Sequence, residues 1–233
     1  MKNENYKVID KAKALTQWWD GYIYLREKKT GDIYRLKIEY DDTPFNPRTE
    51  YDGNLCTIFS QRGGRDIGDP GFSYIGHEAL EKYEEFKIRQ DKGEIFMLPI
   101  YMYEHGGQTI SLEDFHDRFD SGVCAYAFVE KKRIFEEYPD ATEENWEEKA
   151  YKAIQVEIDI YDKYIKGETY AWLLEKAEET EHKRKSDGYV WTTIEWELED
   201  SCGGYLGDPE ESGLIEQAVG DRFDYIKKLE EQK

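Results

Sequence analysis

Long apolar runs, paired cysteines and positive charge are all scarce in this sequence of 233 residues. No apolar run approaches the roughly 20 residues that a membrane-spanning helix needs, and the polar start of the chain lacks the apolar segment of a signal peptide. The three cysteines are widely spaced and form no CxxC pair, which argues against a zinc site and a disulfide scaffold. We therefore expect a cytoplasmic protein without a membrane segment.

Basic residues are outnumbered by acidic ones, 32 against 52, which leaves a formal net charge of −20. This charge disfavours direct binding to nucleic acid or an anionic membrane, and it favours a basic protein surface as the partner. Aromatic residues make up 15% of the chain, which excludes a disordered acidic tail. The sequence therefore predicts a folded acidic protein.

The negative charge is concentrated in two segments. Glu136–Glu181 holds fifteen carboxylates and five lysines, and Glu195–Asp224 holds ten carboxylates and one arginine. The first segment also contains the strongest helical pattern of the chain, with apolar residues at 3.6-residue spacing: Trp146, Ala150, Ile154, Ile158, Tyr161 and Ile165. We expect this helix to begin with a cap at Asp140 or Thr142 and to expose its acidic side.

Alternating patterns around glycine-containing turns predict two hairpins. One joins Tyr22–Arg26 to Ile33–Tyr40, and the other joins Thr169–Lys176 to Tyr189–Glu199. In the last strand Val190, Thr192, Ile194, Trp196 and Leu198 share one face, while Glu195, Glu197 and Glu199 share the other. Hairpins outnumber βαβ units, so we expect one α+β domain over residues 1–233, with an antiparallel sheet and helices packed on it.

Further elements are expected along the chain. Residues 7–19 and 76–92 read as helices, and residues 122–130 as a central strand. Pro99 within the strand 94–103 indicates an edge position or a bulge. Asp208 followed by Pro209 predicts the start of a last helix that places Ile226 and Leu229 inward.

Five motifs resemble a family of uncharacterised proteins carried by phages and conjugative elements of bacteria. They are Asn54–Thr57 leading to Ile67–Asp69, Leu98–Gly107 with Thr109, Asp120–Val123, Tyr161–Tyr170, and Asp200–Tyr205. The resemblance covers most of the chain in order and implies no assigned reaction. It implies a mobile-element setting in a bacterial host cell, where small acidic proteins often inhibit host defence.

The acidic segments suggest that carboxylates imitate phosphates. Pairs such as Glu143 and Glu147, four residues apart on a helix, repel each other unless a partner uses them. We therefore predict an inhibitor that occupies a basic, nucleic-acid-binding host defence complex, of CRISPR type or restriction type. The predicted contact residues are Glu143, Glu144, Glu147, Glu148, Glu195, Glu197, Glu210 and Glu211. The alternative is a solvated acidic surface, in a structural or regulatory protein without a defence role.

The glycine-rich loops suggest an enzyme as the rival hypothesis, with a hydrolase site at His105, Asp120 and Asp200. Nucleophilic catalysis by Cys202 with His105, and a divalent metal held by Asp66, Asp69, His105 and Asp200, are further alternatives. None has diagnostic spacing, and Asp and Ser side chains also cap local turns. Residues 62–65, Arg-Gly-Gly-Arg, lack a Walker pattern. We expect no metal or cofactor, and binding more than catalysis.

Overall fold

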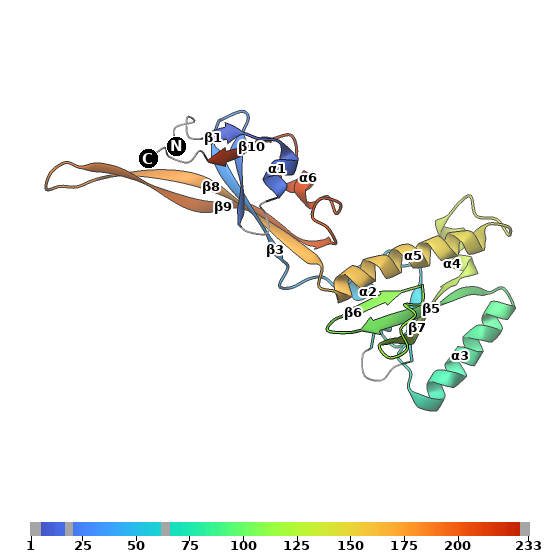
Figure 1. Cartoon of the computed structure of the whole chain (residues 1–233). Helices are drawn as coiled ribbons and strands as arrows, with labels where there is room; N and C mark the ends of the chain where they lie inside the picture. The colour runs from blue at the N-terminus through green and yellow to red at the C-terminus, as the bar shows by residue number, and fades with distance from the viewer. Residues whose placement is uncertain (1–5, 17–20, 62–65, 229–233) are drawn as a thin grey trace. The chain divides into compact units, whose positions relative to one another are not determined.

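The computed structural model describes residues 6–16, 21–61 and 66–228 (Figure 1). Within this part the chain forms six helices and ten strands in two antiparallel sheets, which confirms the predicted α+β fold. The chain divides into two compact units, which are described separately below. Unit 1 combines Met1–Pro44 with Thr169–Lys233, and unit 2 is Phe45–Glu168. That residues 1–233 act as one domain stays a prediction.

Unit 1 is built on a six-stranded sheet that contains both predicted hairpins. In spatial order its strands are β1 (Tyr6–Val8), β10 (Phe223–Lys228), β2 (Tyr22–Glu27), β3 (Ile33–Tyr40), β8 (Thr169–Lys183) and β9 (Val190–Leu206). The alternation of β3 places Tyr34, Leu36 and Ile38 in the core, together with α1 (Lys11–Leu15) and α6 (Leu214–Ala218). Period-two burial therefore fixes the register of this strand.

Both ends of unit 1 differ from the predicted helices. The helix expected over residues 7–19 begins at Lys11, because Tyr6–Val8 pairs with β10; Trp19 lies outside the described residues. The extent of the predicted last helix is also wrong: the helix begins at Leu214, after the turn at Asp208, and Leu229 lies outside the described residues. The helix ends at Ala218, Gly220 adopts a positive φ of 49°, and Ile226 lies in β10 between β1 and β2. Pairing with two distant strands overrides the local helical spacing here.

Unit 2 contains a four-stranded sheet. Its order is β4 (Thr57–Ser60), β7 (Ser121–Glu130), β5 (Ile95–Glu104) and β6 (Gln108–Ser111), which confirms the central position of β7. Pro99 pairs with β7 only, because β6 begins to pair with β5 at Tyr101, and the register shifts after Ile100. Pro99 therefore lies on a locally free edge beside a bulge, as expected from its missing N–H.

Helices cover both faces of the unit 2 sheet (Figure 1). The elements are α2 (Pro47–Glu50), α3 (Gly76–Asp91), α4 (Lys131–Glu137) and α5 (Trp146–Ile165). The predicted stripe of α5 is buried from Trp146 to Tyr161, whereas Phe86 of α3 packs on the opposite face. α5 begins later than expected, since Asn145 rather than Asp140 or Thr142 is its N-cap. Among the described helices, none is long and apolar enough to cross a membrane.

Candidate partner-binding surfaces

The predicted contact glutamates are divided equally between the units. Unit 2 holds Glu143, Glu144, Glu147 and Glu148, and unit 1 holds Glu195, Glu197, Glu210 and Glu211. Within either unit the structure therefore brings together four of the eight at most. The two groups have different surroundings, which decide how much charge each can offer to a partner.

The glutamates around the start of α5 are partly compensated within unit 2. Glu143 forms an ion pair with Lys131, and Glu148 forms one with Lys152. The hydrogen bond from Lys152 lowers the pKa of Glu148. Glu147 and Glu148 also lie in the first helical turn, where the helix dipole favours negative charge. Contacts within unit 2 therefore stabilise much of the negative charge of this group.

Glu210 and Glu211 belong to a turn that precedes α6. The Asp208 carboxylate accepts hydrogen bonds from the backbone N–H groups of Glu210, at 2.8 Å, and Glu211, at 3.2 Å. The Glu210 side chain forms an ion pair with Lys11 at 3.0 Å. Asp208 thus caps a turn, and one of the two glutamates already has a cationic partner.

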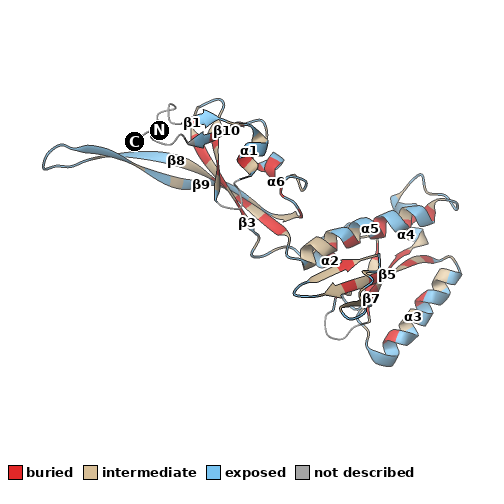
Figure 2. Ribbon diagram, in the orientation of Figure 1, coloured by how far each residue is buried: buried red, intermediate tan, exposed pale blue. Residues whose placement is uncertain are grey.

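Glu195 and Glu197 lie on a two-stranded arm, defined here as residues 177–197. The pairing between β3 and β8 ends at Lys176, which lies opposite Glu197, and beyond it β8 and β9 pair only with each other among the described residues. Figure 2 shows that most of this extension is exposed on both strands. The arm therefore presents side chains to solvent on both faces.

The shaft of the arm, defined as residues 177–181 and 192–197, is acidic. Glu178 lies directly opposite Glu195, and Glu197 follows on the same face. The nearest lysine, Lys176, is shared: its Nζ is 3.1 Å from Asp32 and 3.7 Å from Glu178. The shaft carboxylates are those of Glu178, Glu179, Glu181, Glu195 and Glu197. A like-charge cross-strand pair destabilises a sheet, so stability does not account for this arrangement.

The tip of the arm is basic and aromatic, a feature that the sequence reasoning missed. The stacked rings of His182 and Trp191 lie 5.2 Å apart, those of Trp191 and Tyr189 lie 6.0 Å apart, and Arg184 lies 5.3 Å from the Tyr189 ring. Lys183 and Lys185 flank Arg184. This Lys-Arg-Lys run, visible in the sequence, is the signal that marks the tip. The acidic surface is therefore limited to the shaft.

The residues of the rival hydrolase hypothesis are brought together only in part. His105 Nδ1 lies 3.1 Å from Asp120 Oδ2 in unit 2, and the His105 side chain is 73% exposed. Asp200 and Cys202 belong to unit 1, where Asp200 accepts a hydrogen bond from the backbone N–H of Ser201. The geometry therefore supplies a solvent-exposed histidine–carboxylate pair.

The residues of the metal-site alternative have other partners within the protein. Both oxygens of Asp69 bind Arg48, and Asp66 binds Ser73 and the backbone N–H of Gly68. Across the described residues there is no group of three or more His, Cys, Asp or Glu side chains that could hold a metal ion. The Arg-Gly-Gly-Arg loop, residues 62–65, lies outside the described residues.

Arg48 forms a buried network that sequence reasoning also missed. Its guanidinium donates to Asp69 at 2.9 and 2.7 Å, to Glu157 at 2.6 Å and to the Cys56 carbonyl at 2.8 Å. Glu157 in turn accepts from the backbone N–H of Leu55 at 2.6 Å. The network ties α2, the β4 segment and α5 together over long sequence separations. Its charges are paired, which indicates a structural role.

Burial changes the proton affinities around this network. Burial, followed by the charge of Glu157, raises the pKa of the Cys56 thiol well above its usual value. Burial also raises the pKa of Tyr161 to about 12. Burial lowers the pKa of Arg48, but its hydrogen bonds with Asp69 and Glu157 and the charges around it together outweigh this effect and raise the pKa overall. At neutral pH the site therefore holds a charged arginine beside a protonated thiol.

Several of the five resembling motifs serve as structural ties. Asp162 of the fourth motif accepts from the Thr109 hydroxyl at 2.7 Å and the Ile110 N–H at 2.8 Å, which joins it to the second motif. In the fifth motif, the Gly204 N–H donates to Asp41 at 2.8 Å, and a side chain on Gly203 would meet that carboxylate. These contacts explain why Asp and Gly stand at such positions without a catalytic role.

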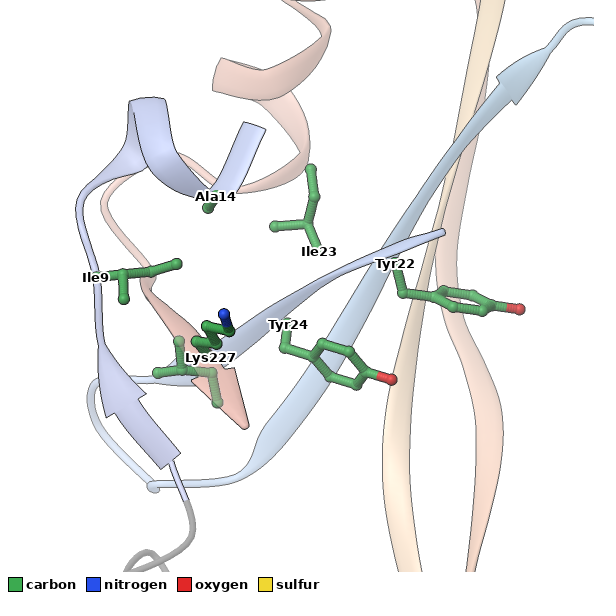
Figure 3. Close-up of a pocket in the computed structure, with 7 residues that line it drawn as sticks. Ile9, Ala14, Tyr22, Ile23, Tyr24 and Lys227 are labelled. Carbon is green, nitrogen blue, oxygen red and sulfur yellow. The ribbon is translucent and has the colours of Figure 1, made fainter. Parts of the chain in front are cut away.

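One pocket of unit 1 has a volume of about 200 Å³ and lies between α1, β2 and β10 (Figure 3). Ile23 points toward Ala14, whereas Tyr22 and Tyr24 point to the other face of the sheet. The chain that joins Ala14 to Tyr22 passes through residues 17–20, which are not described. We assign no ligand to this pocket.

No protein-family model, curated protein or solved structure matches this chain. Its function must therefore be argued from its own residues.

Proposed function

We propose that this protein binds a basic, nucleic-acid-binding complex of a bacterial host and inhibits it by presenting carboxylates in place of phosphates. The resemblance to phage and mobile-element proteins supports a defence complex, of CRISPR or restriction type, as the target. The observation that carries the proposal is the acidic shaft of the arm, where Glu178 and Glu195 face each other and Lys176, which pairs with Glu178, is shared with Asp32.

The charge density of the shaft favours imitation of a single strand. Five carboxylates and Lys176 lie along the stretch of β9 between Thr192 and Glu197 and the paired part of β8, with Glu178, Glu195 and Glu197 on one face and Glu179 and Glu181 on the other. At about 3.3 Å per residue this stretch is roughly 17 Å long, so it carries about one net negative charge per 4 Å when both faces are counted. A single strand within B-DNA has about one phosphate per 3.4 Å, and the duplex has one per 1.7 Å. Counted over both faces, the net charge of the shaft per unit length is therefore close to that of one phosphate strand.

The test is inhibition of purified CRISPR-type and restriction-type complexes, measured as nucleic-acid binding and cleavage while this protein is titrated in. Charge reversal of the shaft, with Glu178, Glu195 and Glu197 replaced by lysine, should abolish inhibition. Inhibition by the unaltered protein should weaken with salt, because exposed charges are screened. The matched control reverses Glu78, Glu81 and Glu84 on α3, which changes the net charge equally and should leave inhibition intact.

Two outcomes count against the proposal. One is equal inhibition by the shaft variant and the unaltered protein. The other is equal loss in the α3 control, which would show that only the net charge matters. Reversal of Glu143, Glu144, Glu147 and Glu148 tests separately whether the group at α5 contributes; we expect the smaller effect there, because Lys131 and Lys152 already pair with it.

A further inference from the structure

β9 is an edge strand that leaves one side open for pairing. The sheet order ends with β8 and β9, so among the described residues β9 has β8 as its only strand partner. Natural edge strands are usually protected by lysine, proline or short length. β9 runs from Val190 to Leu206 and contains no lysine, arginine or proline. This edge is long and lacks lysine and proline, and its register against β8 is continuous from Val190 to Leu198, before the irregularity beside Leu174 and Glu175.

The hydrogen-bond register shows which backbone groups face the open side. The Arg184 N–H donates to the Tyr189 carbonyl at 2.7 Å, so these two residues form a hydrogen-bonded pair. Bonded and non-bonded pairs alternate along an antiparallel ladder, and the register is continuous from Lys183 to Glu175. Val190, Thr192 and Ile194 therefore point their N–H and C=O groups away from β8. An added strand would pair with these groups.

The side chains beside this edge determine what kind of strand it accepts. Val190 is 46% exposed and Ile194 is 42% exposed, and both lie on one face of the arm. Glu195 and Glu197 lie on the other face, together with Glu178. Glu179 and Glu181 of β8 lie opposite Ile194 and Thr192 on the first face. An extended segment whose apolar residues contact Val190 and Ile194, and whose lysine or arginine residues lie beside Glu195 and Glu197, therefore complements β9. The regular alternation of a strand gives it this pattern.

A second copy of the chain fits the inner half of this edge less well. Antiparallel pairing centred on Trp196 would place Glu195 of one copy opposite Glu197 of the other. Like charges that lie directly opposite each other destabilise a strand pair. The acidic residues of β9 therefore disfavour self-pairing along the inner half of the arm and favour a basic partner.

We infer that β9 binds its partner by strand addition: an extended, basic segment of the partner pairs with the open edge of the arm at Val190, Thr192 and Ile194. This inference rests on the proposed function, because it names how the acidic arm engages its basic target. Main-chain hydrogen bonds supply affinity in this mode, and the side chains supply selectivity.

The experiment measures binding of a short peptide of alternating lysine and valine to the full chain by isothermal titration calorimetry. Two changes remove edge hydrogen bonds without changing charge. The variant Thr192→Pro removes one outward N–H, and proline is tolerated on a free strand edge. On the peptide side, N-methylation of alternate amides blocks one edge of the peptide. We expect each change to weaken binding about tenfold or more, equivalent to about 1.4 kcal/mol.

The inference is overturned if the unaltered protein and Thr192→Pro bind the plain and the N-methylated peptide equally well. Charge attraction alone would then explain the affinity. Absence of peptide binding to the unaltered protein would also overturn it. The proposed function is judged separately, by the inhibition assay with the shaft charge-reversal variant, so either can fail alone. The N-methylated peptide keeps the test decisive if Thr192→Pro disturbs the arm. Dimerisation of the chain, measured by sedimentation and abolished by Thr192→Pro, would identify the occupant as a second copy and overturn the basic partner.

Discussion

Replacing Arg48 with methionine should destabilise unit 2 severely. Arg48 has a 3% exposed side chain, and the carboxylates that it binds, Asp69 and Glu157, are 14% and 11% exposed. The substitution leaves both carboxylates poorly solvated and without their cation. Removing one partner of a buried ion pair costs about 3–5 kcal/mol. Since whole domains are stable by only about 5–15 kcal/mol, unit 2 should come close to unfolding.

Urea denaturation combined with hydrogen exchange, resolved by peptide mass spectrometry, measures this effect. Amides of β4, β7 and α5 should exchange faster in Arg48→Met, whereas β2 and β3 of unit 1 should change little. Lys152→Met serves as the control in the same unit, because Lys152 and Glu148 are both well exposed and such pairs contribute little.

A rescue experiment separates lost charge pairing from lost packing. Neutralising both acids, with Asp69→Asn and Glu157→Gln in the Arg48→Met background, should recover part of the loss, because uncompensated charge is then removed. If Arg48→Met unfolds within about 1 kcal/mol of the unaltered protein, or if exchange rises equally in both units, the network does not hold unit 2 together.

Three further predictions address other sites. Gly203→Ala should destabilise unit 1 by about 1–3 kcal/mol in urea denaturation, because the new Cβ would lie 2.6 Å from an Asp41 oxygen, whereas Gly53→Ala, with open space around it, should be nearly neutral. A thiol reagent should label Cys202 in the folded protein and Cys56 only after unfolding, as read by mass spectrometry, since Cys56 is buried and its raised pKa keeps it protonated. Because burial raises the pKa of Tyr161 from 10.0 to about 12, its contribution to stability is full below about pH 10 and is lost as the pH rises through 12. Alkaline denaturation should therefore be less steep in Tyr161→Phe, and an unchanged slope would contradict this assignment.

The sequence by itself determined the elements whose pattern is local. The hairpin of β2 and β3 follows from alternation around a glycine turn, and the buried stripe of α5 follows from helical spacing, because each depends on neighbours within a few residues. It also determined the amount of negative charge. For the candidate site, the sequence identified the glutamates of the arm and their total charge. It did not determine how exposed these glutamates are.

Tertiary structure alone decided which charges are paired and which strands meet. Arg48 finds Asp69 and Glu157 only because folding brings together segments up to 109 residues apart. Residues 223–228 form the strand β10 because they pair with both β1 and β2, although their local spacing favours a helix. The arm extends beyond β3 because β3 ends its pairing with β8 at Lys176. Each outcome depends on contacts distant in sequence, whose energies no local pattern contains.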